Sequence, residues 1–195
     1  KVLPKDSVLL DLGAGQSDFA ELTKAFNVCA VDFYPYPGVH VVCNFEDGLT
    51  FKDASVDVVV LANVLEHVRE PNALLRECHR ILKPGGVLLG TVPFMIQIHQ
   101  RPYDFYRYTH MNLEYMLPKH AFKNVSVIPV SNLYALLFNV TTSFFMAVIR
   151  KAKYTLVYRI AWKIVRIKFA LFRRFFEKRS SDADSPLGYL FKAYK

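Results

Sequence analysis

The sequence predicts an α/β domain built on a mostly parallel sheet of seven strands, with helices on both faces and a helical insertion before the last strand. Three observations lead to this prediction. Short apolar runs alternate with segments of helical periodicity, a glycine turn directly follows the first run, and a long stretch of different composition precedes the final run. With 195 residues, of which 52% are hydrophobic and 22% charged, the chain can bury the core of one such domain.

Each short apolar run is typical of a buried parallel strand. The first run, Ser7–Leu12, ends at Gly13, and Ser17–Phe26 then places apolar residues at helical spacing. Further strands are expected at Val28–Phe33, Val39–Cys43, Val56–Ala62, Gly86–Pro93, Val125–Val130 and Leu187–Tyr194, and further helices at Asn72–Leu82 and Thr109–Lys119. Strands that alternate with helices are joined by right-handed crossovers, which build a Rossmann-like parallel sheet.

The charge distribution separates a core from an insertion. Residues 1–149 carry 12 Lys and Arg against 14 Asp and Glu, whereas residues 150–179 carry 11 against one, a net charge of +10. We therefore expect a core of residues 1–130 and 187–195, and an apolar, basic insertion with its linker at residues 131–186. Since the core is slightly acidic, an anionic partner is expected to bind the insertion.

The turn after the first strand is a candidate cofactor site. The sequence DLGAG places Gly13 and Gly15 where a backbone must approach a ligand closely. Asp32 ends the second strand, where a carboxylate can accept both hydroxyls of a ribose. Asp18 stands where a dinucleotide fingerprint needs a small residue, so NAD and FAD are disfavoured. Asp11 adds a negative charge that suits an ammonium and a sulfonium group better than a pyrophosphate.

Several stretches of the chain resemble the class I S-adenosylmethionine-dependent methyltransferases, in particular their type 11 group. They are VLLDLGAG, AVDF, CNFEDGLTFKDASVDVV, LANVLEHV and ILKPGGVLL, and the resemblance resumes in Tyr103–Leu117 and in the terminal strand. It implies that the cofactor is S-adenosyl-L-methionine and that the product formed from it is S-adenosyl-L-homocysteine.

The resemblance also implies a set of cofactor-binding residues. They are Asp11, Gly13 and Gly15 for the methionine moiety, Asp32 for the ribose, Phe33 for one face of the adenine, Asn44 and Phe45 for its edge, and Asn63 in a stretch beside the cofactor. Most members have Asp where this chain has Asn44. An amide oxygen can still accept a hydrogen bond from the adenine amino group, so we expect weaker discrimination and not lost binding.

The candidate catalytic residues are His67, His99 and Asp104. His67 follows the fourth strand, where an imidazole is either a base near neutral pH or a capping residue. The other two lie after the fifth strand, the usual position of a substrate lid. The lid sequence is similar to the run H-x-x-P-x-D-F-x-R-Y-T of methyltransferases from glycan-assembly settings. For His99 the alternative is packing, and for Asp104 it is an ion pair with Arg107.

No metal site is expected from the sequence. The three cysteines, Cys29, Cys43 and Cys78, lie in apolar runs without the spacing of metal ligands. We expect them to be small buried side chains in a reducing compartment, which predicts a cytoplasmic location. Because the chain opens on Lys1 and not on Met, we also expect it to be a trimmed fragment.

Within the insertion, Tyr154–Phe176 predicts an amphipathic helix. At 100° per residue its basic side chains share one stripe, formed by Arg159, Lys163, Arg166, Arg173 and Arg174. A wide apolar face beside a basic stripe is typical of a helix that lies in an anionic membrane surface. Ser131–Ile149 is uncharged but is interrupted by polar residues, which is poor for a membrane span. A helical hairpin packed on itself or across a homodimer is the alternative.

Together these features predict a peripherally membrane-associated methyltransferase of the cytoplasm, whose acceptor is a small molecule, a lipid-linked saccharide or another amphiphile. One alternative is an RNA-directed methyltransferase that uses the basic helix. We do not expect nucleic acid, because the helix has many more bulky apolar residues than a phosphate-tracking arm requires. A second alternative is a non-catalytic subunit that binds the cofactor weakly.

Overall fold

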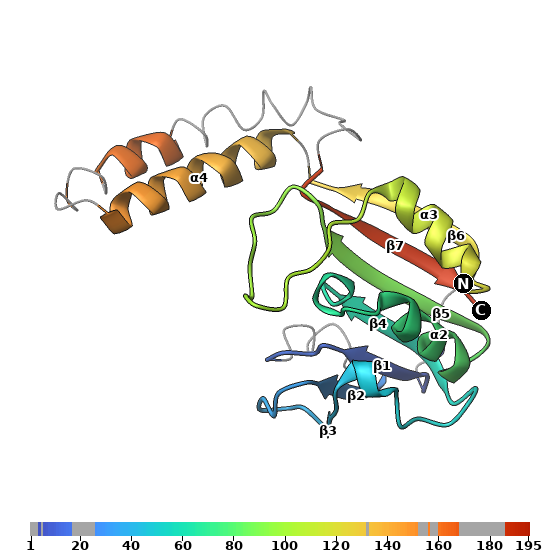
Figure 1. The fold of residues 1–195 in the computed structure, drawn as a ribbon. Coiled ribbons are helices and arrows are strands. Elements are labelled where there is room, and N and C mark those ends of the chain that lie inside the picture. The colour runs from blue at the N-terminus through green and yellow to red at the C-terminus, as the bar shows by residue number, and fades with distance from the viewer. Residues whose placement is uncertain are drawn as a thin grey trace. The chain divides into compact units, whose positions relative to one another are not determined.

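In a computed structural model, the chain divides into two compact units (Figure 1). The first comprises Lys1–Ile128 with Tyr189–Lys195, and the second comprises Pro129–Gly188. The structure describes residues 4, 6–16, 26–131, 133–151, 156, 160–167 and 186–195. The helix predicted at Ser17–Phe26 lies outside these residues, apart from Phe26.

One sheet of seven strands forms the centre of the first unit, as predicted. Its strands are β1 (Val8–Leu12), β2 (Asn27–Asp32), β3 (Val41–Val42), β4 (Val56–Ala62), β5 (Leu82–Pro93), β6 (Lys123–Val130) and β7 (Gly188–Tyr194), in the order β3-β2-β1-β4-β5-β7-β6. The pairs β1–β2, β1–β4, β2–β3 and β4–β5 are parallel. The predicted α/β, mostly parallel, Rossmann-like fold is therefore confirmed.

The last strand runs against its neighbours. The N–H of Lys195, after the end of β7, donates to the carbonyl of Gly86 near the start of β5. Before the start of β7, the N–H of Leu187 donates to the carbonyl of Val130 at the end of β6. Both contacts join opposite ends of the strands, so β7 is antiparallel to β5 and to β6, and the sheet is mixed at this edge.

The segment Lys83–Gly86 is a bulge and not a simple turn between helix and strand. Leu82 pairs with Val56 and Val87 pairs with Val58, so β5 holds three more residues than β4 over this interval. Gly85 has a φ of +75°, which a side chain disfavours. The strand predicted to begin at Gly86 therefore begins at Leu82, because pairing resumes on both sides of the bulge.

Two helices lie on the near face of the sheet in Figure 1. Helix α2 (Pro71–Ile81) starts with Pro at its first turn, and helix α3 (His110–Lys119) starts after Thr109, whose side chain accepts a hydrogen bond from the N–H of Asn112. Their bounds agree with the predicted helices to within one residue. His120, at the end of α3, contacts Asn72 of α2 at 2.8 Å, which joins the two helices.

The core consists of aliphatic side chains from the central strands and from α2. Leu10, Leu61 and Leu88 are fully buried in the sheet, and Leu74, Leu75, Cys78 and Ile81 cover it from the helix. All three cysteines are free, but only Cys78 is buried, whereas Cys29 and Cys43, also expected to be buried, are partly exposed. Desolvation raises the pKa of each thiol above its ordinary value.

The second unit is helical, as predicted for the insertion. Helix α4 spans Leu133–Lys151, and residues 160–167 form part of a further helix. Trp162 joins the two, because its ring lies 5.9 Å from that of Phe138 and 5.7 Å from that of Phe145. Of the predicted helix Tyr154–Phe176, only residues 156 and 160–167 are described. Among the described residues, no helix has both the length and the apolarity that a membrane crossing requires.

Apolar side chains of this unit remain exposed in stripes at helical spacing. On α4 they are Leu137, Val140 and Phe144, and on the second helix they are Ile160, Ile164 and Ile167. Positions three or four residues apart share one helix face, so each helix presents a continuous apolar stripe.

Replacement of Gly90 by alanine is expected to destabilise the sheet. A Cβ atom at this position would lie 2.2 Å from Cζ of Phe191 and 2.8 Å from the carbonyl oxygen of Leu61. Overpacking of this kind costs about 1–3 kcal/mol of the free energy of unfolding. Denaturant unfolding of G90A measures the loss, and adding F191L should regain part of it. A double variant no more stable than G90A would contradict this packing.

Candidate functional site

The loop after β1 brings backbone close to a neighbouring side chain. Gly13 has a φ of +79°, and a Cβ atom there would lie 2.5 Å from Cγ2 of Val64. Gly15 has a φ of +54°. Glycine is the residue that adopts these angles without strain, and at Gly13 it also leaves room for Val64. The predicted glycine turn is therefore required by both conformation and space.

The carboxylate of Asp32 holds this loop in place. Its Oδ2 accepts a hydrogen bond from the N–H of Gly15 at 2.8 Å, and its Oδ1 accepts one from the N–H of Tyr34 at 2.9 Å. Asp32 is 8% exposed at the carboxyl end of β2. Carboxylate oxygens have further lone pairs, so both can still accept hydroxyl donors. Asp32 lines the crevice at the ends of β1 and β2, and its binding of a ribose stays a prediction.

Asp11 is a buried carboxylate at the end of β1. It is 6% exposed, and its Oδ1 accepts no hydrogen bond from any residue that the structure describes. Burial raises the pKa of Asp11, and the nearby charge of Asp32 raises it further. An unpaired buried oxygen costs free energy until a donor reaches it. A ligand ammonium group would supply donors and a compensating charge.

The glycine loop and Asp32 border a cleft of about 1040 Å³. Of the residues predicted from the sequence, Gly13, Gly15, Asp32, Phe33, Asn44, Phe45, Asn63 and His67 line it. Asp11, His99 and Asp104 are not among its lining residues. Lining residues that were not predicted from the sequence are Tyr34, Tyr36, Glu46, Arg69 and Gln100. The two tyrosines lie one and three residues after Phe33 in the sequence FYPYP, so their position just beyond Asp32 was the signal that could have predicted them.

Exposed aromatic rings cover one side of the cleft. Phe33 is 47% exposed and Tyr34 49% exposed. The ring centroid of Phe33 lies 5.0 Å from that of Tyr34 and 6.4 Å from that of Tyr103, and Tyr36 extends the group at 5.9 Å from Tyr34. Such rings offer both stacking faces and polar edges to a ligand.

Two asparagines beside the cleft already have partners within the protein. Asn44 caps the short helix η1 (Phe45–Asp47), since its Oδ1 accepts a hydrogen bond from the N–H of Glu46 at 3.1 Å. Asn63 follows β4 in a left-handed conformation, with a φ of +54°, and its Oδ1 accepts from the hydroxyl of Thr91 at 3.2 Å. An oxygen has two lone pairs, so each can accept one further donor.

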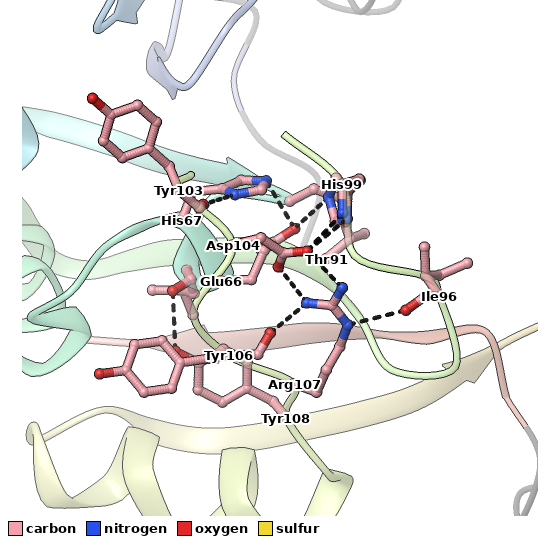
Figure 2. Close-up of polar contacts among 12 residues, drawn as sticks. Glu66, His67, Thr91, Ile96, His99, Tyr103, Asp104, Tyr106, Arg107 and Tyr108 are labelled. Carbon is pink, nitrogen blue, oxygen red and sulfur yellow. Dashed lines mark hydrogen bonds and ion pairs between the residues drawn. The ribbon is translucent and has the colours of Figure 1, made fainter. Parts of the chain in front are cut away.

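The lid, residues 94–109 between β5 and α3, is hydrogen-bonded to the short helix η2 (Leu65–His67). The N–H of Phe105 donates to the carbonyl of Glu66 at 2.8 Å, and the hydroxyl of Tyr108 donates to the carbonyl of Leu65 at 3.1 Å. His67 completes the connection, because its Nδ1 contacts the carbonyl of Tyr103 (Figure 2). The lid is thus held against η2 by main-chain contacts.

Asp104 and Arg107 form an ion pair inside the lid. Arg107 binds both carboxylate oxygens of Asp104, which is 2% exposed, and its Nη2 lies 2.9 Å from Oδ2 (Figure 2). The guanidinium holds the pKa of Asp104 far below its ordinary value. The same Oδ2 accepts a hydrogen bond from the N–H of His99 at 2.7 Å. These contacts favour a positioning role for Asp104 over a role as a base.

Glu66 lies between the two candidate histidines. Its Oε1 is 3.6 Å from Nε2 of His67 and 3.8 Å from Nε2 of His99. Burial raises the pKa of Glu66 to about 7, and burial lowers the pKa of His67. The structure therefore brings His67 and His99 together, although 32 positions separate them in the sequence. Beside them it places the buried carboxylate of Glu66, a residue for which the sequence favours a structural over a catalytic role.

Comparisons with known proteins agree with this geometry. A family profile described as "Methyltransferase domain", type 11, matches residues 10–90. A probable S-adenosylmethionine-dependent methyltransferase of Mycobacterium tuberculosis is 35% identical over 96 residues, which are 44% of this chain and 35% of that protein. A ubiquinone biosynthesis O-methyltransferase of Pseudomonas aeruginosa is 38% identical over 61 residues, which are 31% of this chain and 24% of that protein.

The fold has counterparts among solved structures. A S-adenosylmethionine-dependent methyltransferase from Archaeoglobus fulgidus superposes with a TM-score of 0.64 at 17% identity, covering 98% of this chain and 87% of that one. The chain spans about a third or less of the length of the curated relatives just described. Residues 10–90 match the methyltransferase domain of type 11, and the chain as a whole has the fold of S-adenosylmethionine-dependent methyltransferases.

Proposed function

We propose that this chain transfers a methyl group from S-adenosylmethionine to a hydroxyl of an amphiphilic or saccharide-type acceptor at a membrane surface. The observation that carries the transfer activity is the pair of buried carboxylates, Asp11 and Asp32, at the adjacent ends of β1 and β2. Asp11 would pair with the ammonium group of the cofactor, and Asp32 would accept from its ribose hydroxyls. The cofactor supplies an electrophilic methyl group on a sulfonium.

Transfer requires an aligned acceptor and removal of its proton. The acceptor oxygen bonds to the methyl carbon while the carbon–sulfur bond breaks, and the hydroxyl proton goes to a base or to water. The protein supplies alignment through the lid, which is fixed to η2, and exclusion of water through the aromatic rings around Tyr103. His67 lines the cleft next to this lid, so we place the acceptor hydroxyl at the histidine end.

Replacement of Asp32 by alanine is expected to weaken cofactor binding about 100-fold. Loss of charge-assisted hydrogen bonds costs about 3 kcal/mol, which corresponds to that factor. The variant also frees the N–H of Gly15, so the loop is held less firmly. Titration calorimetry with S-adenosylmethionine measures the change.

Asp47→Ala is the matched control, because Asp47 is an exposed carboxylate outside the cleft lining. It should bind the cofactor like the unaltered protein. If titration with S-adenosylmethionine produces no heat with the unaltered protein, D32A or D47A, only a non-catalytic role for the fold is left. Equal binding by D32A and D47A would refute the assignment of the ribose site.

An acceptor with both polar and apolar parts is supported by the cleft's lining. Tyr34, Tyr36 and Tyr103 present rings that can stack on a sugar or an isoprenoid, while Arg69 and Gln100 add hydrogen-bond donors. One similar protein is named as an O-methyltransferase of ubiquinone biosynthesis, whose acceptor class fits this combination. A lipid-linked saccharide is the acceptor that we favour.

Membrane binding is supported by the exposed apolar stripes of the second unit. Ile160, Ile164 and Ile167 are each at least 50% exposed on one helix, and the basic side chains Lys163 and Arg166 lie between them in the sequence. With a net charge of +10 over residues 150–179, the segment is suited to an anionic bilayer surface. The cytoplasmic side of a membrane is where we propose that the chain acts.

Replacement of Ile164 by aspartate is expected to reduce binding to anionic vesicles at least tenfold. Burial of an isoleucine contributes about 1.5–3 kcal/mol, and the new charge adds repulsion. Flotation with phosphatidylglycerol-containing vesicles measures the bound fraction. Ile128→Asp is the control, since Ile128 is 54% exposed, against 50% for Ile164, but lies on β6 in the first unit. Equal flotation of the two variants would argue against this surface.

The same two variants, I164D and I128D, also test the two alternatives, which are RNA binding and dimerisation. A salt-sensitive shift of RNA without flotation would favour the RNA-directed methyltransferase. A dimer of the unaltered protein that I164D converts to a monomer, again without flotation, would favour the hairpin packed across two copies.

A further inference from the structure

Glu66 carries a buried carboxylate that lacks a hydrogen-bond partner among the described residues. The residue is completely buried, and neither Oε1 nor Oε2 accepts a hydrogen bond from the part of the chain that the structure describes. Burying a carboxylate without a partner costs several kcal/mol. A group that supplied positive charge at this point would remove that cost.

Two imidazole nitrogens converge on this carboxylate. Nε2 of His67 and Nε2 of His99 lie 3.6 and 3.8 Å from Oε1, and the three groups offer ligand atoms that all lie within 4.8 Å of one another. Ligands bound at about 2.1 Å in a tetrahedral site are about 3.4 Å apart. The two contacts to Oε1 are within about half an ångström of that spacing, whereas a separation at the 4.8 Å limit of the group would have to shorten by about 1.4 Å (4.8 − 3.4) for the three atoms to share one ion. Figure 2 draws both contacts to Glu66.

The outer hydrogen bonds of both rings leave these nitrogens free to bind a cation. Nδ1 of His67 faces the carbonyl oxygen of Tyr103, which can only accept, so this nitrogen carries the proton. Nδ1 of His99 lies 3.4 Å from Oδ2 of Asp104 and 3.3 Å from the carbonyl of Gln97, which are also acceptors. In both rings Nε2 is then the unprotonated nitrogen. A histidine held by a carboxylate or a carbonyl in this way is the usual outer arrangement of a metal site.

We propose that Glu66, His67 and His99 bind a divalent first-row transition-metal ion, with Zn²⁺ the best match. Two imidazoles and one carboxylate form the donor set of catalytic zinc sites, which keep a fourth position open. Mg²⁺ and Ca²⁺ prefer oxygen ligands and fit poorly. The sequence predicted no metal because the ligands come from η2 and from the lid, without a recognisable spacing.

The open coordination position would allow the ion to bind the acceptor in the proposed reaction. Because His67 also lines the cofactor cleft, an acceptor hydroxyl bound at the ion would lie beside that cleft. The ion lowers the pKa of the hydroxyl, whose proton leaves to water, and the oxygen then takes the methyl group as the carbon–sulfur bond breaks. The histidines act through the ion and not as bases. This role rests on the proposed methyl transfer, whereas binding of the ion does not.

Chelator-treated protein titrated with Co²⁺ and with Zn²⁺ tests the site. We expect one equivalent of Co²⁺ to produce visible absorption, and Zn²⁺ to displace it. Glu66→Gln keeps the shape of the side chain but removes its charge, and should weaken binding at least tenfold. His99→Ala removes a ligand that is partly exposed and should do the same. At the same concentration, zinc should raise the melting temperature of the unaltered protein more than that of either variant.

His120→Ala is the matched control, because His120 lies at the end of α3 and contacts Asn72 instead. It should bind both metals like the unaltered protein. No absorption and no zinc-dependent rise in melting temperature in the unaltered protein would overturn the proposal, as would equal binding by H99A. If E66Q fails to fold, the metal binding of H99A decides whether the proposal holds. Calorimetry with S-adenosylmethionine on the same samples separates loss of the metal from loss of the cofactor site.

Discussion

The parallel pairing of β1 with both β2 and β4 is the constraint on which the site depends. It aligns Leu12 with Val31 on one side and with Leu61 on the other, so the three strands end at the same edge of the sheet. The glycine loop, Asp32 and Asn63 follow these ends directly. Loops at this edge can change without disturbing the sheet, which is why ligand-binding and catalytic residues are commonly found there.

The glycine loop and the Asp32 carboxylate depend on each other. Asp32 accepts a hydrogen bond from Gly15, and the close approach of Gly13 to Val64 sets the loop against the end of β4. The loop is therefore organised before a ligand arrives, and a cofactor would add hydrogen bonds to an arrangement that already exists. Preorganisation of this kind reduces the free energy spent on ordering when a ligand binds.

Glu66 links the fold to the lid in two ways. Its carbonyl anchors the lid by accepting hydrogen bonds from Phe105 and Tyr106, while its side chain points toward His67 and His99. A buried carboxylate is expensive in a structural role alone, since an apolar residue of similar size would hold the same backbone contacts. This cost is the reason to look for a cation at Glu66.

The second unit adds a different property, namely apolar helix faces without a covering surface among the described residues.

The sequence alone determined the order of the elements, the glycine turn, Asp32 at the end of β2 and the insertion before β7. These features depend on local periodicity and on residues that favour special backbone angles, and both can be recognised in the sequence. The tertiary structure alone decided between the two alternatives for Asp104, in favour of the ion pair with Arg107, and it alone brought Tyr34 and Tyr36 to the cleft and Glu66 to two histidines. Side chains on η2 and on the lid meet only after the sheet has formed, because their separation along the chain carries no information about their distance in space.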